Sequence, residues 1–203
     1  MVINGLQTTS TMTQEELKEI AEEHHRDMVS LGWSDHSKSN EHYLMLTIGE
    51  IGEAMQSHRR GLVHFKHPVG LEFLHEYIDD PLLADNIYVE AFEFYVKDSV
   101  ADEMADALLR ILEHIKMRGY DYLLDLEESP LVGYDSKPLF SENGFTFSTL
   151  CTSSADMPTR LWKAMWFVIR WAKNIDIDLL LACRRKMRYN RLRNDWQNHE
   201  KKY

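Results

Sequence analysis

Residues 40–61, NEHYLMLTIGEIGEAMQSHRRG, constrain the fold more than any other stretch of the chain. Leu44, Ile48, Ile51 and Met55 recur at i, i+4, i+7 and i+11, the spacing that places apolar side chains on one side of an α-helix. Asn40 can cap the start of such a helix, and Gly61 is typical of its end. The stretch therefore predicts one long amphipathic helix.

Four other segments also predict helices. The first has Thr13 as N-cap with Glu16 three residues later, which is the capping-box pattern. Only 9 Gly and 5 Pro among 203 residues favour long helices over a turn-rich β-sandwich. We therefore expect an all-α bundle of four to five long helices. The further helices are expected from Thr13 to Gly32, from about Lys97 to Gly119, from Pro158 through residue 175, and from about Asp176 through residue 193.

Two stretches lack a sustained helical period. Residues 62–92 contain two prolines, and we expect short helical pieces there, with turns at 68–70 and at Asp80–Pro81. Residues 126–157 are rich in Ser, Thr, Gly, Pro and Asp, which indicates a long surface loop. A chain of 203 residues with 44% hydrophobic composition can bury one substantial core, so we expect one domain over residues 1–203.

Charge and composition argue against several classes of function. The formal net charge of −10 argues against a stable nucleic-acid partner, because phosphate neutralisation needs a positive surface. We expect no membrane partner, since no apolar run is long enough for a span and the N-terminus does not resemble a signal peptide. Cys151 and Cys183 form no disulfide framework or zinc motif. We therefore expect a cytoplasmic protein.

Two acidic pairs are the candidate chemistry. Glu50 and Glu53 stand one helical turn apart on the helix of residues 40–61, on the side away from its apolar stripe, and Glu103 and Asp106 repeat this spacing on the helix that ends at Gly119. If the two helices pack antiparallel, the four carboxylates can converge on one site. Oxygen ligands of this kind suit Mg²⁺, with Mn²⁺ as a possible substitute.

The last helix offers complementary groups. Lys186, Asn190 and Arg193 fall at i, i+4 and i+7, on one side of that helix. A lysine, an amide and an arginine so placed can hold a polyphosphate while Mg²⁺ screens the acids. Together with the acidic pairs, they indicate metal-assisted phosphoryl or nucleotidyl chemistry.

The chain resembles the all-α nucleoside triphosphate pyrophosphohydrolases, specifically their MazG-like branch. Members carry an ExxE motif followed by an ExxD motif on adjacent helices, which read here as EIGE (residues 50–53) and EMAD (residues 103–106). The resemblance extends to the Gly32–Trp33 step, to LMLTIGEIGEAMQSHRRG, to KDSVADEMADALLRIL, to KMRYNRLR and to the ending NHEKKY. Relative to compact members, the chain carries insertions at about residues 62–92 and 126–172.

The resemblance implies a Mg²⁺-dependent nucleoside triphosphate pyrophosphohydrolase, which would convert an NTP or dNTP to the monophosphate and pyrophosphate. Glu50, Glu53, Glu103 and Asp106 would hold the metal, and either Glu50 or Glu53 would activate the attacking water. The resemblance also implies a homodimer or homotetramer. The implied nucleotide-binding residues are Lys186, Asn190, Arg193, Lys97, Arg60, Trp33 and Lys201.

Two alternatives can be stated. The first is a non-catalytic helical interaction or nucleotide-binding protein whose acidic pairs are merely solvated. It predicts no effect of metal on stability, whereas the enzyme predicts that Mg²⁺ with nucleotide raises the melting temperature. The second is a phosphohydrolase of the His-Asp type, which we set aside because the chain contains no His-Asp dipeptide.

Overall fold

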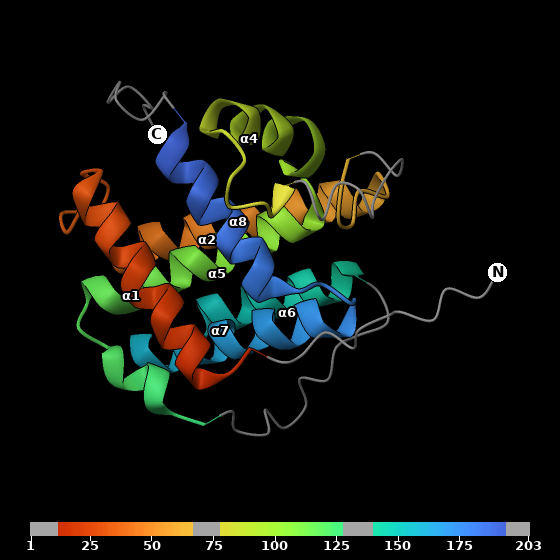
Figure 1. Cartoon of the computed structure of the whole chain (residues 1–203). Coiled ribbons are helices and arrows are strands. Elements are labelled where there is room, and N and C mark those ends of the chain that lie inside the picture. Colours follow the sequence, from red (N-terminus) through yellow and green to blue (C-terminus); the bar gives the residue numbers. More distant parts are fainter. Residues whose placement is uncertain (1–11, 67–77, 128–139, 194–203) are drawn as a thin grey trace.

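The computed structural model describes residues 12–66, 78–127 and 140–193, and these residues form helices and no β-strand (Figure 1). This confirms the predicted all-α fold. The three short elements are α4 (Asp85–Ala91), the π-helical turn η1 (Phe92–Val96) and the 3₁₀ turn η2 (Asp121–Asp125). The longer helices are α1 (Gln14–Ser30), α2 (Asn40–Arg59), α5 (Val100–Met117), α6 (Phe140–Thr152), α7 (Met157–Asn174) and α8 (Leu179–Leu192).

Glycines end three of the helices as predicted. Gly32, Gly61 and Gly119 follow α1, α2 and α5, and their φ angles are 72°, 75° and 68°. After Gly32, the Trp33 N–H donates to Met28 O at 2.8 Å, five residues back, which is the Schellman closure. The same bonds follow Gly61 and Gly119. A positive φ suits glycine because it has no Cβ to clash with the backbone.

The helix starts agree less closely with the predictions. Thr13 and Glu16 form the expected capping box at α1. The prediction that Asn40 caps α2 was wrong, because Ser39 Oγ accepts from the His42 N–H at 3.2 Å and Asn40 is the first helical residue. The last helix starts after Asp176 rather than at it: Asp178 is its N-cap, and its Oδ1 accepts from the Leu181 N–H at 2.9 Å.

The approach to α5 is broken rather than continuous. We expected a helix from about Lys97, but η1 ends at Val96 and Asp98 takes a left-handed φ of 62°. Ser99 then caps α5, its Oγ accepting from the Asp102 N–H at 3.2 Å. The Asp98 N–H in turn donates to Asp102 Oδ2 at 3.0 Å, so this break is tied to the first turn of α5.

The loop expected over residues 126–157 was wrong for α6. Its sequence, FSENGFTFSTLCT, is poor in strong helix formers, and packing stabilises it instead. Phe147 is completely buried and lies against Phe167 of α7. Gly144 allows α2 to come close, since a Cβ there would lie 2.5 Å from Met55 Sδ.

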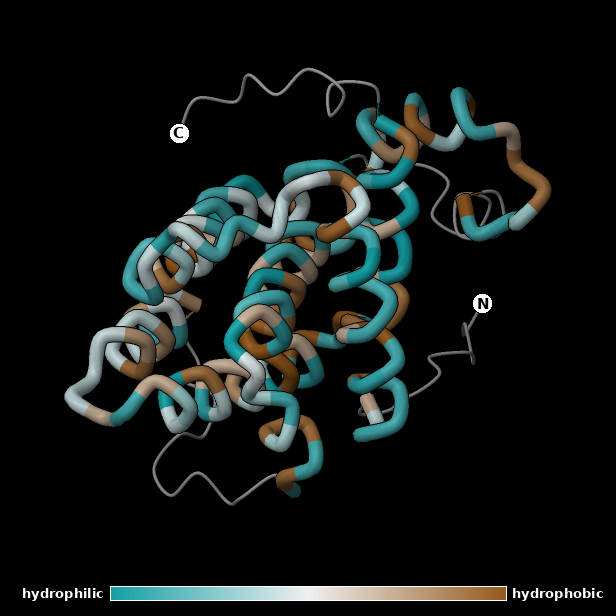
Figure 2. Tube along the Cα trace, turned by 90° about the vertical axis from the view of Figure 1, so that its left-hand side faces the viewer, coloured by the Kyte–Doolittle hydropathy of each residue, from teal (hydrophilic) through white to brown (hydrophobic). Residues whose placement is uncertain are grey.

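Helix α5 is the centre of the bundle and packs against α1, α2, α7 and α8 (Figure 1). Figure 2 shows apolar and polar residues interleaved along each helix, as expected of helices with one buried side. In α5 the buried residues extend almost all round the helix and include titratable ones, namely Asp102, Glu103, Glu113 and His114.

The described part of residues 62–92 packs on α8 around a smaller apolar cluster. Phe92 stacks on Tyr189 of α8 with ring centroids 4.4 Å apart. The expected turn at Asp80–Pro81 is present, whereas the one expected at 68–70 lies outside the described residues. None of the helices in the described ranges combines the length and the apolar character needed to cross a membrane.

Candidate metal centre

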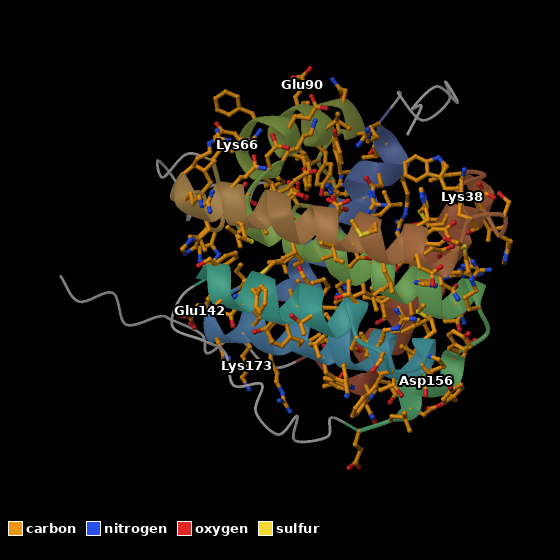
Figure 3. The ribbon with its side chains drawn as sticks, turned by 180° about the vertical axis from the view of Figure 1, so that it is seen from behind. Lys38, Lys66, Glu90, Glu142, Asp156 and Lys173 are labelled. Carbon is orange, nitrogen blue, oxygen red and sulfur yellow. The ribbon has the colours of Figure 1, made fainter. Side chains whose placement is uncertain are left out.

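Antiparallel packing of α2 on α5 brings the two acidic motifs together. Three contacts run in opposite order along the two helices: Asn40 Oδ1 with His114 Nε2 at 3.0 Å, Glu50 with Arg110, and Ser57 Oγ with the carbonyl of Asp98 at 2.7 Å. Seen from behind, the two helices cross the middle of the molecule side by side, with the labelled charged side chains at its periphery (Figure 3). The ExxE and ExxD motifs therefore face each other between buried helices.

Three carboxyl groups converge at this crossing. One oxygen each from Glu50, Glu103 and Asp106 lie within 4.8 Å of one another, close enough to share a cation. Glu50 and Glu103 are buried and Asp106 is half-buried. The acids are buried although they lie away from the apolar stripe of α2, because α5 is enclosed by its neighbours.

Glu103 is the least compensated of the three. The residue is 4% exposed, and no residue in the described ranges gives its side chain a hydrogen bond or an ion pair. Burial, followed by the charges of Asp102 and Asp106, raises the pKa of Glu103 to about 10. Without a cation this carboxyl therefore keeps its proton at neutral pH, and a divalent ion would be a natural replacement for that proton.

Among the described residues, Glu50 has one side-chain partner. Arg110, one turn beyond Asp106 on α5, donates from Nε to Glu50 Oε1 at 2.5 Å. Burial and the nearby Asp106 charge raise the pKa of Glu50, and Arg110 opposes that rise. Sequence reasoning missed Arg110, although its i+4 spacing from Asp106 places both on the same side of α5.

Lys186 is a buried internal cation. Its Nζ lies 2.9 Å from Asp102 Oδ1 and 2.6 Å from Asp106 Oδ2, and the residue is 6% exposed. Burial alone would lower the pKa of Lys186, but the two carboxylates outweigh it and raise this pKa. Burial also raises the pKa of Asp102 to about 6, against the opposing pull of Lys186. Sequence reasoning also missed Asp102, which lies one turn before Asp106.

Glu53 does not join the group. It lies one turn after Glu50 on α2 and its side chain is exposed. The three-carboxyl group within 4.8 Å does not include it. The expectation of a four-carboxylate site is therefore met by only three of the named acids in the described structure.

The other two residues of the α8 set lie on the same helix as Lys186. Asn190 is half-buried, and its buried Oδ1 accepts no hydrogen bond from the described residues. Arg193 is the C-cap of α8, with its guanidinium carbon 5.3 Å from the centre of the Tyr189 ring. The helix therefore ends just before Arg193. Of Lys186, Asn190 and Arg193, only Lys186 forms an ion pair with the described acids, Asp102 and Asp106.

The remaining nucleotide-binding candidates are dispersed. Trp33 follows α1 and is half-buried, Arg60 ends α2 and is exposed, and Lys97 lies half-buried between η1 and α5. Lys201 falls outside the described residues. Of these, Lys97 is nearest in the chain to the acid group, because it shortly precedes Glu103. Its neighbour Asp98 is bonded to Asp102 in the first turn of α5.

Comparison of the chain with protein-family models, with curated proteins and with solved structures gave no match. Carboxylate oxygens are hard ligands that suit Mg²⁺ or Mn²⁺. The group contains no imidazole or thiolate, which are the usual ligands of zinc.

Proposed function

We propose that the protein is a Mg²⁺-dependent nucleoside triphosphate pyrophosphohydrolase of the MazG-like type. The observation that carries the proposal is the convergence of Glu50, Glu103 and Asp106 between α2 and α5, with Glu103 buried and unpartnered among the described residues. The order of the motifs along the chain, ExxE, then ExxD, then KMRYNRLR, supports the same assignment.

The three carboxyls would hold the ion, with Glu103 losing its proton on binding. A bound Mg²⁺ supplies charge neutralisation for a triphosphate and lowers the pKa of a coordinated water. Glu53, exposed beside the group, is the residue that we assign to orienting or deprotonating the attacking water. Attack at the α-phosphorus would release pyrophosphate and leave the monophosphate.

Cationic and amide groups of α8 and its neighbours would receive the substrate. Asn190 has an unused acceptor oxygen, which suits a donor on a sugar or a base. Arg193, at the end of α8, suits a phosphate, because a guanidinium matches phosphate oxygens in geometry and charge. Lys186 is engaged by Asp102 and Asp106, so its direct role is to balance their charge.

A panel of purified NTPs and dNTPs with Mg²⁺, scored for pyrophosphate and orthophosphate, tests the proposal. We expect pyrophosphate as the first product, abolished in Glu103→Gln and retained in Glu90→Gln, which removes an exposed carboxylate on α4. Orthophosphate as the first product would contradict the bond assignment. Absence of any turnover in the whole panel would contradict the proposed activity.

One observation favours the non-catalytic alternative. Arg110 and Lys186 already pair with Glu50, Asp102 and Asp106, so the cluster could be an internal ion-pair network that fixes the packing of α2, α5 and α8. That protein would show no rise in melting temperature with Mg²⁺ and nucleotide, whereas the proposed enzyme would.

A further inference from the structure

We propose that Arg110 is the positioning residue of the metal centre, holding Glu50 by one carboxylate oxygen so that the other is presented to the ion. The inference rests on the proposed function, because it assumes that Glu50, Glu103 and Asp106 bind a divalent cation. It concerns the only metal-ligand candidate that α2 contributes to the group within the described residues.

The contact geometry supports this role. Arg110 Nε donates to Glu50 Oε1 at 2.5 Å, and in the described ranges no other residue gives Glu50 a side-chain hydrogen bond or ion pair. A carboxylate has two oxygens, so this single bond leaves Oε2 for a cation. Hydrogen bonds to the second oxygen of a metal-bound carboxylate are a common way of fixing its orientation.

The location of Arg110 explains why Glu50 needs such a partner. Glu103 and Asp106 share one helix, so their separation is set by α5 itself, whereas Glu50 must be held across a helix–helix contact. Arg110 lies one turn beyond Asp106 and spans that contact from the α5 side. It therefore connects the α2 ligand to the helix that carries the other two.

Burial distinguishes this pair from an ordinary surface ion pair. The Glu50 side chain is 11% exposed and that of Arg110 is 32% exposed. A carboxylate buried at a helix–helix contact and held by one charged donor has little freedom to turn, so Arg110 would orient Glu50 before any metal arrives.

Three substitutions separate the hydrogen bond from the charge. Gln at position 110 places an uncharged N–H donor where Arg110 carries Nε, so Arg110→Gln keeps the bond and removes the charge. Arg110→Met keeps a similar stem and removes both. Arg184→Met is the matched control, because Arg184 is an exposed arginine on α8 whose partner is Glu19 at 3.4 Å.

Mn²⁺ binding to the purified full-length chain, followed by calorimetry or by electron paramagnetic resonance, is the readout. The melting temperature without metal reports folding separately. We expect Arg110→Met to bind Mn²⁺ about 10- to 100-fold more weakly than the wild type. We expect Arg110→Gln to recover most of that loss and Arg184→Met to match the wild type.

Each other outcome has a defined meaning. Tighter Mn²⁺ binding by folded Arg110→Met would show that Arg110 competes with the metal, and unchanged binding would show that it plays no part in positioning Glu50; either result would overturn the inference. Equal losses in the Gln and Met variants would assign the effect to charge and overturn it as well. If the wild type itself showed no saturable Mn²⁺ binding, the metal centre and the proposed function would fail, and the role of Arg110 with them.

Discussion

The ammonium group of Lys186, on α8, lies 2.6 Å from Oδ2 of Asp106, on α5, inside the protein rather than on a phosphate-binding surface. The same nitrogen lies 2.9 Å from Asp102, which is 2% exposed. A charge pair enclosed in this way is favourable only while both partners are present. This lysine therefore ties the packing of α8 to the charge state of the acidic site.

Lys186→Met should destabilise the fold strongly. The substitution keeps the apolar stem but leaves Asp102 and Asp106 without their cation, and breaking a buried pair costs about 3–5 kcal/mol. The free energy of unfolding from urea titration measures the effect. Adding Asp102→Asn should recover part of the loss, whereas Arg184→Met alone should change stability by no more than about 0.5 kcal/mol. A Lys186→Met protein as stable as the wild type would show that the pair is not needed for packing.

Glu103→Gln should separate stability from metal binding. In metal-free protein, Glu103 must take up a proton to be buried beside Asp102 and Asp106, and the amide is neutral without it, so the melting temperature should be equal to or above that of the wild type. The same change removes a metal ligand, so Mn²⁺ should no longer raise the melting temperature. Loss of metal-free stability would mean that the Glu103 side chain has a structural partner in the folded protein.

The pH dependence of stability should carry a contribution from His114. Burial, followed by the charges of Arg118 and Arg160, lowers the pKa of His114 from 6.5 to about 4. Between these values the unfolded chain binds a proton that the folded chain does not, so stability rises with pH across this window. His114→Gln should flatten the slope by up to about 1.4 kcal/mol per pH unit. Urea titrations at several pH values measure it.

Exposed His36 provides the control for this experiment, since His36→Gln should leave the slope of the wild type unchanged. His24 is also buried, and its pKa is likewise lowered to about 4, mainly by burial. Both histidines therefore contribute to the pH dependence of wild-type stability. The difference between the slopes of the wild type and His114→Gln gives the contribution of His114 alone. An unchanged slope in that variant would mean that His114 is accessible to protons in the folded state.

Substitution by alanine should change the stability of the protein in opposite directions at two helical glycines. At Gly144 of α6 a Cβ would lie 2.5 Å from Met55 Sδ, so Gly144→Ala should destabilise by about 1–3 kcal/mol. At Gly49 of α2 a Cβ would meet nothing within 4 Å, so Gly49→Ala should stabilise by roughly 0.5–1 kcal/mol through helix propensity. Thermal unfolding of the two variants compares them directly. A stabilising Gly144→Ala would contradict the close approach of α2 and α6.

The sequence predicted those features that local chemistry determines. Glycine ends and the Thr13 capping box follow from the few residues around them, and so they were predicted correctly. Helix α6 was missed because its residues favour a helix only when Phe147 and Leu150 are buried by α2 and α7. Tertiary packing, which single-segment patterns do not contain, decides such an element.

The same distinction applies to the site. Helical spacing was enough to pair Glu103 with Asp106, and the antiparallel arrangement of α2 and α5 brought Glu50 to them. Spacing could not show that Glu53 is exposed and stays outside the three-carboxyl group, or that Lys186 turns inward to Asp102. Which side of a helix faces which neighbour depends on the packing of the whole bundle.

Anomalous diffraction from a crystal soaked in Mn²⁺ tests whether the three carboxyls bind a divalent cation. We expect an anomalous peak between α2 and α5, with carboxylate oxygens of Glu50, Glu103 and Asp106 at about 2.0–2.3 Å from it. A fully soaked crystal with Mn²⁺ bound only elsewhere, and with the three carboxyls unchanged, would contradict it.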